Sequence, residues 1–234
     1  MLILKIGIGN WKIETIRYDA KNLVGYRVPN HAHNDFLQVA AESGLQIPKT
    51  LISNQTEEIR SFFDEVNGQM IAKLQQSLSF SMGRSGQFFP TTKIEIEHLE
   101  QMEDTLKYCP MMFQEYVPKS YELRIAYVDG KYFTGKISTN RTSSGQTDWR
   151  NTEMQGAEWE AYDLPQKEQA ALQAFMENLG LVTGGIDMIR KPTGEYVFLE
   201  VNPSGEWGML QHKLGFPIAE QIGEAILRRI SNEE

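Results

Sequence analysis

Apolar residues recur along this chain with two different periods, and each period predicts a different kind of element. Between Thr56 and Gly68 the apolar positions follow the i, i+3, i+4, i+7 spacing of an amphipathic helix, with two glutamates in the first turn. Comparable spacing predicts four further helices, near residues 34–42, 99–106, 165–180 and 216–230. The chain therefore contains helices distributed along its whole length from residue 34 onward.

Alternating apolar and polar residues predict strands between these helices. Residues 123–128 and 132–137 flank Asp129-Gly130, a strong hairpin signal, and residues 185–190 and 195–201 form a second candidate hairpin. Short apolar runs predict three more strands, at 51–52, 70–74 and 111–117. Two polar stretches, 77–90 and 139–162, are predicted loops. Hairpins interleaved with helices predict an α+β fold with largely antiparallel sheets.

Composition narrows the function classes. The 234 residues carry 31 acidic and 23 basic side chains, a net charge of -8, which argues against a general nucleic-acid binder. The single cysteine, Cys109, excludes an intrachain disulfide and a cysteine zinc site, and it favours a cytoplasmic location. No run approaches the roughly 18 apolar residues that a membrane span requires, so no membrane partner is expected.

The second hairpin carries the strongest chemical signal. If Thr193-Gly194 is a two-residue turn, Asp187 lies opposite Glu200 on one face, and Asn202 follows on that face. Two carboxylates about 5 Å apart inside apolar strands repel each other and favour a hard cation such as Mg²⁺. The alternative is a sheet whose acidic side chains face solvent. The hairpin alone leaves both interpretations open.

Four segments carry a family resemblance. They are Phe198-Leu-Glu-Val-Asn-Pro-Ser-Gly-Glu-Trp207, Phe113-Gln-Glu-Tyr-Val-Pro-Lys119, Tyr121-Glu-Leu-Arg124 and Asp148-Trp-Arg150. Together they resemble ATP-grasp ligases, and more narrowly the ligases that mature ribosomally made peptides of the microviridin (graspetide) type. The resemblance spans roughly residues 31–230. It implies the ATP-grasp fold, in which two α/β lobes with largely antiparallel sheets enclose the nucleotide.

The resemblance also implies an activity. Such enzymes use ATP and Mg²⁺ to activate Asp or Glu side chains of a precursor peptide as acyl phosphates, and they join them to Ser/Thr hydroxyls or Lys amines. The partner would be the leader and core of that peptide, with a homodimer or a full-length ligase as a further partner. Two alternatives stay open: a non-catalytic relative that binds a peptide or a partner ligase, and a ligase that adds free amino acids to a protein tail.

Residue roles follow from the same resemblance. Lys73 would contact the ATP phosphates, with residues 79–86 closing over them, and Glu122 would accept hydrogen bonds from the ribose. Arg124 and Arg150 would neutralise the transferring phosphoryl group, because a planar guanidinium binds phosphate bidentately. Asp187, Glu200 and Asn202 would bind the metal. The backbone of a hinge would bind adenine through Gln114, Glu115, Tyr116 and Val117.

The resemblance divides the chain into three parts. Residues 31–110 would form a central lobe and residues 111–234 a C-terminal lobe with the metal site. Residues 1–30 would be a remnant or replacement of the N-terminal domain that precedes the ATP-grasp part in such ligases. One position departs from the family pattern, since Asp35 stands where a phosphate-contacting lysine is usual. A carboxylate there is expected to weaken nucleotide binding or to alter the site's role.

Overall fold

The computed structural model describes residues 16–18, 34–73, 91–106, 108, 110–138, 158–203 and 205–231. The chain divides into two compact units, each built around its own sheet. Unit 1 comprises Met1–Asp35 and Pro48–Val117, and unit 2 comprises Phe36–Ile47 and Pro118–Glu234. Among the described residues, no helix is both long and apolar enough to cross a membrane.

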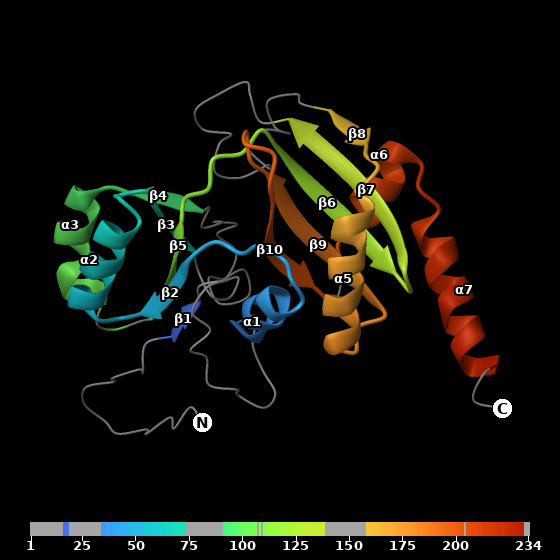
Figure 1. The fold of residues 1–234 in the computed structure, drawn as a ribbon, viewed down its shortest axis with the longest axis horizontal. Helices are drawn as coiled ribbons and strands as arrows, with labels where there is room; N and C mark the ends of the chain where they lie inside the picture. The colour runs from blue at the N-terminus through green and yellow to red at the C-terminus, as the bar shows by residue number, and fades with distance from the viewer. Residues whose placement is uncertain are drawn as a thin grey trace, which may run out of the picture. The chain divides into compact units, whose positions relative to one another are not determined.

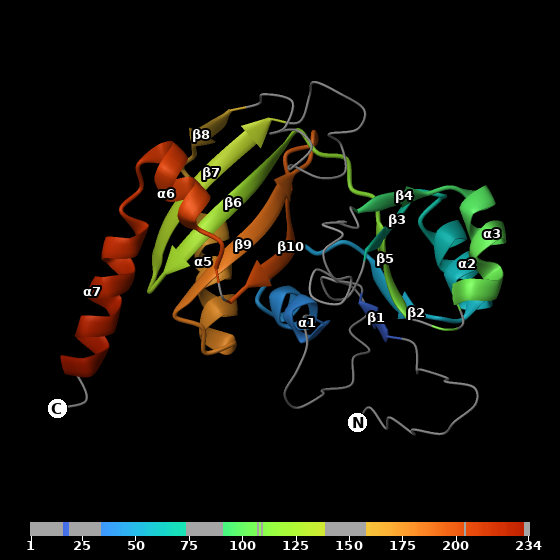
Figure 2. The ribbon, with the colours of Figure 1, turned by 180° about the vertical axis from the view of Figure 1, so that it is seen from behind.

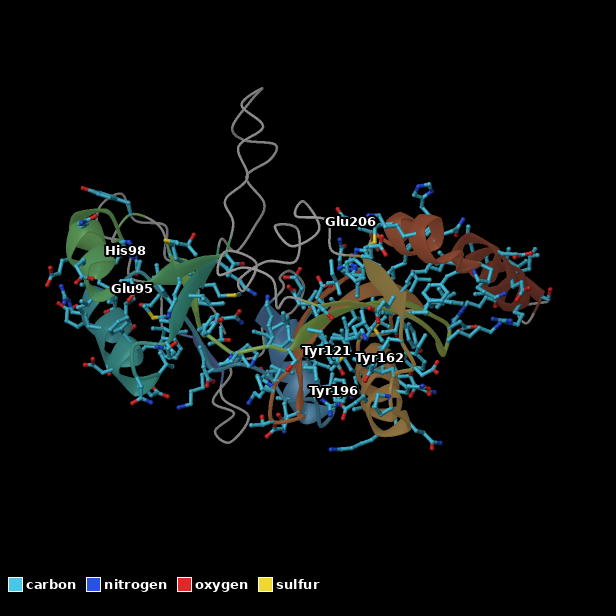
Figure 3. The ribbon with its side chains drawn as sticks, turned by 90° about the horizontal axis from the view of Figure 1, so that it is seen from above. Glu95, His98, Tyr121, Tyr162, Tyr196 and Glu206 are labelled. Carbon is cyan, nitrogen blue, oxygen red and sulfur yellow. The ribbon has the colours of Figure 1, made fainter. Side chains whose placement is uncertain are left out.

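Unit 1 contains a five-stranded antiparallel sheet of order β1-β2-β5-β3-β4. Its strands are β1 (Ile16–Tyr18), β2 (Thr50–Ser53), β3 (Met70–Lys73), β4 (Thr92–Ile94) and β5 (Met111–Glu115). Two helices accompany the sheet, α2 (Thr56–Glu65) and α3 (Ile96–Leu106). The N-terminus of α3 is capped by a side chain, because Glu95 N–H donates to His98 Nδ1 at 3.0 Å (Figure 3).

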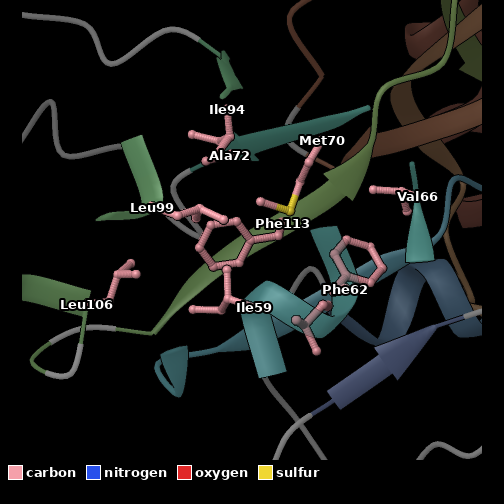
Figure 4. Close-up of a cluster of buried hydrophobic side chains, with 10 residues drawn as sticks. Ile59, Phe62, Val66, Met70, Ala72, Ile94, Leu99, Leu106 and Phe113 are labelled. Atoms are coloured by element: carbon pink, nitrogen blue, oxygen red, sulfur yellow. The ribbon is translucent and has the colours of Figure 1, made fainter. Parts of the chain in front are cut away.

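The core of unit 1 lies between its sheet and these two helices. Figure 4 shows Phe113 of β5 at the centre of a cluster of buried side chains that reach it from the strands and from both helices. Ile59 and Phe62, two of the apolar positions that predicted α2 from its spacing, are almost fully buried in this cluster. The amphipathic period therefore marks the face of α2 that covers the sheet.

Unit 2 contains the second antiparallel sheet, of order β10-β9-β6-β7-β8. Its strands are β6 (Tyr121–Val128), β7 (Lys131–Ser138), β8 (Trp159–Ala161), β9 (Thr183–Arg190) and β10 (Tyr196–Asn202). The helices associated with it are α1 (Asn34–Glu42), α5 (Gln166–Asn178), α6 (Gly208–Leu214) and α7 (Ile218–Ser231). Both long strands of its first hairpin have eight residues in continuous register.

The two faces of this second sheet are covered differently. Helices α1 and α5 lie on one face and helices α6 and α7 on the other (Figures 1 and 2). On the α5 face, Phe175 stacks edge-on against Phe198 of β10 with ring centroids 4.9 Å apart. On the α6/α7 face, Leu210 and Ile218 pack with Ala126 and Ile137. Helices α6 and α7 therefore bury apolar positions of β6 and β7.

Three tyrosines tie the chain after β8 to the sheet. The Tyr162 hydroxyl hydrogen-bonds to the hydroxyls of Tyr121 in β6 and Tyr196 in β10, and Figure 3 shows the three side chains together. Burial raises the pKa of each of these hydroxyls above that of a solvent-exposed tyrosine. This cluster fixes the segment that leads from β8 into α5.

The structure confirms the α+β class and most predicted elements, but the sequence pattern missed four short ones. These are β1, β4, β8 and α6. The three missed strands have three residues each, too few for an alternation to be visible. Strand β8 falls inside the stretch expected to be a loop, 139–162, and pairs with the edge of β7. The pairing partner, rather than the local pattern, makes these segments strands.

The pairing of β5 explains where unit 1 ends. Unit 1 extends to Val117, while the division drawn from the family resemblance, with a lobe over residues 31–110, stays a prediction. Unit 1 reaches Val117 because β5 pairs with both β2 and β3 and so lies in the middle of the first sheet. Residues 36–47 belong to unit 2, where Phe198 N–H donates to Gln46 O at 2.8 Å.

Tyr132 gives unit 2 a pH-dependent contribution to stability. Its hydroxyl donates to Gln169 O at 2.7 Å, and burial raises its pKa from 10.0 to about 12. Because the folded pKa exceeds the unfolded one, this contribution is complete below pH 10 and is lost as pH rises through 12. Tyr132→Phe should lower the free energy of unfolding by on the order of 1 kcal/mol at neutral pH. It should also make the decrease of that free energy above pH 10 less steep. Urea unfolding across that range measures both effects. Equal slopes for parent and variant would contradict the assignment.

Candidate functional site

Three charged side chains form a row across unit 2's sheet. In the strand register Arg124 of β6 is the partner of Asp187 in β9, and Asp187 is the partner of Glu200 in β10. Residues paired across antiparallel strands project from the same face of a sheet. The structure thus brings together three of the residues that sequence analysis nominated, and it places them on neighbouring strands.

A β-bulge decides that Glu200 belongs to this row. The predicted two-residue turn is wrong, because Arg190 pairs with Tyr196 and the loop spans residues 191–195. That register alone would place Leu199 opposite Asp187. An irregularity between Phe198 and Glu200 shifts it by one residue, so the predicted pairing of Asp187 with Glu200 is confirmed. The same shift lets Phe198 reach α5 while Glu200 stays on the opposite face.

Arg124 and Asp187 form a close ion pair within the row. Arg124 Nη1 lies 2.8 Å from Asp187 Oδ2, and the two side chains are 7% and 15% exposed. A pair this buried is costly to break, because the remaining partner would be an uncompensated charge in a poorly solvated place. The guanidinium therefore has a fixed position in the structure.

The chain after β10 holds the other side of this guanidinium. Arg124 Nη2 donates to the backbone carbonyl of Glu206 at 3.3 Å, and Glu206 is labelled in Figure 3. The turn depends on Gly205, whose φ of 58° is left-handed and where a Cβ would lie 3.0 Å from Trp207 Cδ1. Gly205 and Trp207 are part of the segment that carried the family resemblance. This turn gives those residues a structural role.

The two carboxylates of the row, together with the neighbouring Asn202, suit a magnesium ion. Asp187, Glu200 and Asn202 supply two carboxylates and an amide oxygen, with Glu200 exposed and Asn202 half-buried. Within the described ranges, no group of three or more His, Cys, Asp or Glu side chains could hold a metal ion on its own. Magnesium often takes only one or two carboxylates and completes its shell with water and phosphate oxygens. These three residues therefore suit magnesium better than a metal ion that takes all of its ligands from the protein.

Lys119 is a residue that sequence analysis named only as part of a motif. Its Nζ lies 2.8 Å from Glu122 Oε1, and the side chains are 6% and 9% exposed. A buried lysine this close compensates the charge of the carboxylate that was predicted to bind ribose. The spacing Lys-x-x-Glu after an apolar strand was the available signal, and no periodicity argument would have selected it.

Unit 1 carries the residues nominated for phosphate and adenine. Lys73 ends β3, two positions after Ile71, and Ile71 pairs with Gln114 in β5. Gln114 is buried, and its Nε2 donates to Thr50 Oγ1, which in turn donates to Pro48 O. Gln114 Oε1 has no hydrogen-bond partner in the part of the chain that the structure describes. A buried acceptor without a donor is costly, so this oxygen is suited to an external donor.

The hinge residues use part of their backbone internally. Glu115 N–H donates to Lys49 O at 2.9 Å, and Tyr116 N–H donates to Gln69 O at 2.7 Å. Neither of these N–H groups is therefore available to adenine while those bonds persist. For Val117 N–H no backbone acceptor is found among the described residues. Arg150, the loop at 79–86 and the Asp35 side chain lie outside the described residues, so their predicted roles stay predictions.

Comparison with known families identifies the architecture. The family model of the RimK-like ATP-grasp domain matches residues 32–226, which is most of the chain. The chain belongs to the RimK-like ATP-grasp family. The predicted ATP-grasp fold is thereby confirmed, and the two antiparallel sheets with their helices are those of this family. The comparison with curated proteins gives no significant match.

Solved structures of similar chains include two macrocyclases and a RiPP-associated ATP-grasp ligase. The macrocyclase MdnC from Microcystis aeruginosa, bound with precursor peptide MdnA, is 34% identical with a TM-score of 0.72. A Chryseobacterium gregarium RiPP-associated ATP-grasp ligase, in complex with ADP and a leader and core peptide, is 29% identical with a TM-score of 0.73. The macrocyclase MdnB from Microcystis aeruginosa is 41% identical with a TM-score of 0.59.

Coverage is unequal in these three comparisons. The matches cover 84%, 82% and 80% of this chain, but only 60%, 57% and 56% of the respective relatives. The chain therefore spans somewhat more than half the length of the ligases it resembles. The graspetide resemblance drawn from the four sequence segments agrees with these relatives.

The Lys119–Glu122 pair gives a test of the site's electrostatics. Lys119→Met should destabilise the protein by about 3 kcal/mol, because Glu122 becomes an unpaired buried charge. The deficit should shrink as pH falls, since an unpaired buried carboxylate has a raised pKa and becomes neutral. Chemical denaturation at several pH values measures both effects. The double variant Lys119→Met/Glu122→Gln is the control and should recover most of the loss. A single variant as stable as the parent would refute the pairing.

Proposed function

We propose that this chain is the nucleotide-binding part of an ATP-dependent ligase that matures a ribosomally made precursor peptide. The observation that carries the proposal is the row of Arg124, Asp187 and Glu200 on one face of unit 2's sheet. It combines a guanidinium for phosphoryl oxygens with two carboxylates for magnesium. Membership of the RimK-like ATP-grasp family supports this interpretation of the row.

For the nucleotide, we assign the contacts that each unit offers. In unit 1, Lys73 would contact phosphate, and the Val117 N–H and the hinge carbonyls would bind adenine. The unpartnered Gln114 Oε1 supports a ligand donor near the hinge. In unit 2, Glu122 would accept hydrogen bonds from ribose while Lys119, 2.8 Å away, compensates the charge of the carboxylate. Magnesium bound by Asp187, Glu200 and Asn202 would neutralise phosphate charge when present.

The reaction would have two steps, phosphorylation of a carboxylate and transfer of its acyl group. An Asp or Glu carboxylate oxygen of the peptide attacks the γ-phosphorus, forming a carboxyl–phosphate bond and breaking the bond to ADP. A Ser/Thr hydroxyl or Lys amine then attacks the acyl carbon, phosphate leaves, and the nucleophile's proton passes to solvent or phosphate. Arg124 would stabilise charge on the transferring group through the N–H donors not engaged by Asp187 and Glu206. Arg150 would add a second guanidinium.

The peptide substrate rests on the similar ligases. Two of them are described as complexes with a precursor peptide or with leader and core peptides, at 34% and 29% identity to this chain. We therefore propose a precursor peptide as the partner, with an acidic side chain as the activated group. Both ester and amide products agree with this chemistry, and the nucleophile in the precursor would decide between them. We place the reaction in the cytoplasm, where ATP and the newly made peptide occur together.

Nucleotide binding tests the row directly. Calorimetric titration with a non-hydrolysable ATP analogue should show binding that depends on magnesium. Asp187→Asn and Glu200→Gln should each weaken it by about tenfold or more, since each removes a charged ligand. Glu195→Gln is the matched control, because Glu195 lies exposed in the turn of the same hairpin. Absence of magnesium-dependent binding by the folded parent chain would sink the proposal.

Turnover with a candidate precursor tests the reaction class. The full chain, with magnesium and a peptide rich in acidic and hydroxyl side chains, should release ADP only when the peptide is present. The product should be lighter by one water per bond, and added hydroxylamine should trap the activated carboxyl as a hydroxamate. Incorporation of a free amino acid would instead favour tail ligation. Peptide binding without ADP release would favour the non-catalytic alternative.

A further inference from the structure

Strand β9, an interior strand of its sheet, has two adjacent glycines, Gly184 and Gly185, directly after its first residue. Glycine inside a strand is unfavourable, because it loses more backbone entropy on folding than other residues and contributes no side chain to packing. Neither residue has the left-handed φ that would require glycine. The backbone of β9 therefore admits a side chain at both positions, and the reason for glycine must lie in what surrounds them.

The surroundings of the two glycines differ. A Cβ on Gly185 would lie 2.7 Å from Arg124 Nη2, closer than real Cβ atoms approach, and 3.0 Å from Arg124 Cζ, so the guanidinium would have to shift. A Cβ on Gly184 would meet Met176 Cε and Val201 Cγ2, each at 3.1 Å. The two positions point to opposite faces of the strand. Gly185 is thus confronted by the charged row, and Gly184 by apolar side chains that include one from α5.

The space over Gly185 is where the Arg124 guanidinium lies. In the register, Gly185 pairs with Ala126 on β6 and with Asn202 on β10, one same-face step along from the row of Arg124 and Asp187. The Arg124 side chain therefore extends toward this neighbouring row, and its guanidinium lies over the position of Gly185. Its Nη1 is 2.8 Å from Asp187 Oδ2 and its Nη2 is 3.3 Å from Glu206 O. The missing side chain of Gly185 leaves the space that the guanidinium occupies.

We propose that Gly185 is the positioning residue for Arg124, and that its missing side chain keeps the guanidinium against Asp187. A methyl group at Gly185 would lift the guanidinium from the sheet, lengthen both hydrogen bonds and displace its remaining N–H donors. Gly205 also contributes to this position, because its left-handed backbone directs Glu206 O toward Arg124 Nη2. The catalytic meaning of this position rests on the function proposed above, whereas the positioning itself does not.

A double-mutant cycle in thermal unfolding tests the positioning without any ligand. Gly185→Ala should lower the Tm of the parent chain. In an Arg124→Ala background the methyl has room, so the same change should leave Tm unchanged or raise it. Gly184→Ala is the matched control, and its effect should be the same in both backgrounds because its neighbours are Met176 and Val201. An equal loss of Tm from Gly185→Ala in both backgrounds would overturn the proposal.

Nucleotide affinity tests the consequence for the site. With magnesium and a non-hydrolysable ATP analogue, Gly185→Ala should weaken binding by at least about fivefold, and Gly184→Ala should leave it close to the parent value. Parental affinity in a folded Gly185→Ala variant would overturn the positioning role in the site. If the parent itself binds no nucleotide, the proposed function fails, and the unfolding cycle still decides whether Gly185 seats Arg124. The two failures are therefore distinguishable.

Discussion

The Arg124–Asp187 ion pair is the interaction around which unit 2's site is arranged. Its two side chains come from neighbouring central strands, β6 and β9, and both are largely buried. Burying such a pair is worthwhile only when the geometry is good and further hydrogen bonds accompany it. Here the Nη1–Oδ2 distance is short, and the Glu206 carbonyl accepts a second hydrogen bond from the guanidinium. The absence of a side chain at Gly185 leaves space for it. Each neighbouring feature of the site can be understood as a requirement of this pair.

A bulge in β10, the strand next to Asp187, places the core residue Phe198 and the charged residue Glu200 on opposite faces of the sheet. Phe198 and Glu200 are two residues apart in β10, so in a regular strand they would share a face. The bulge between them sends Phe198 to the apolar contact with Phe175 and leaves Glu200 beside Asp187. One inserted residue thus lets a single short strand serve a hydrophobic core on one face and a charged row on the other. Bulges near functional sites commonly redirect a side chain in this way.

The charged row and the apolar cover occupy the same face of unit 2's sheet. Ala126 and Ile137 on this face are buried in the cluster formed with α6 and α7, and Arg124 and Asp187 form their ion pair on the same face. Trp207 joins the apolar cluster directly after Glu206 has provided its carbonyl to Arg124. The Gly-Glu-Trp segment therefore links the helical cover to the charged row. A family motif that looked like a string of unrelated residues has one continuous structural explanation.

The sequence by itself determined the α+β class and most of the helices and strands. Local periodicity carries that information, because helices and hairpins have to bury one face of their own residues. The tertiary structure decided the rest. It set the loop at 191–195 and the bulge that together place Glu200 opposite Asp187, paired β8 with β7 inside an expected loop, and placed β5 in the middle of the first sheet. These features depend on partners from other elements, and neither spacing nor composition specifies where the Arg124 guanidinium finds space.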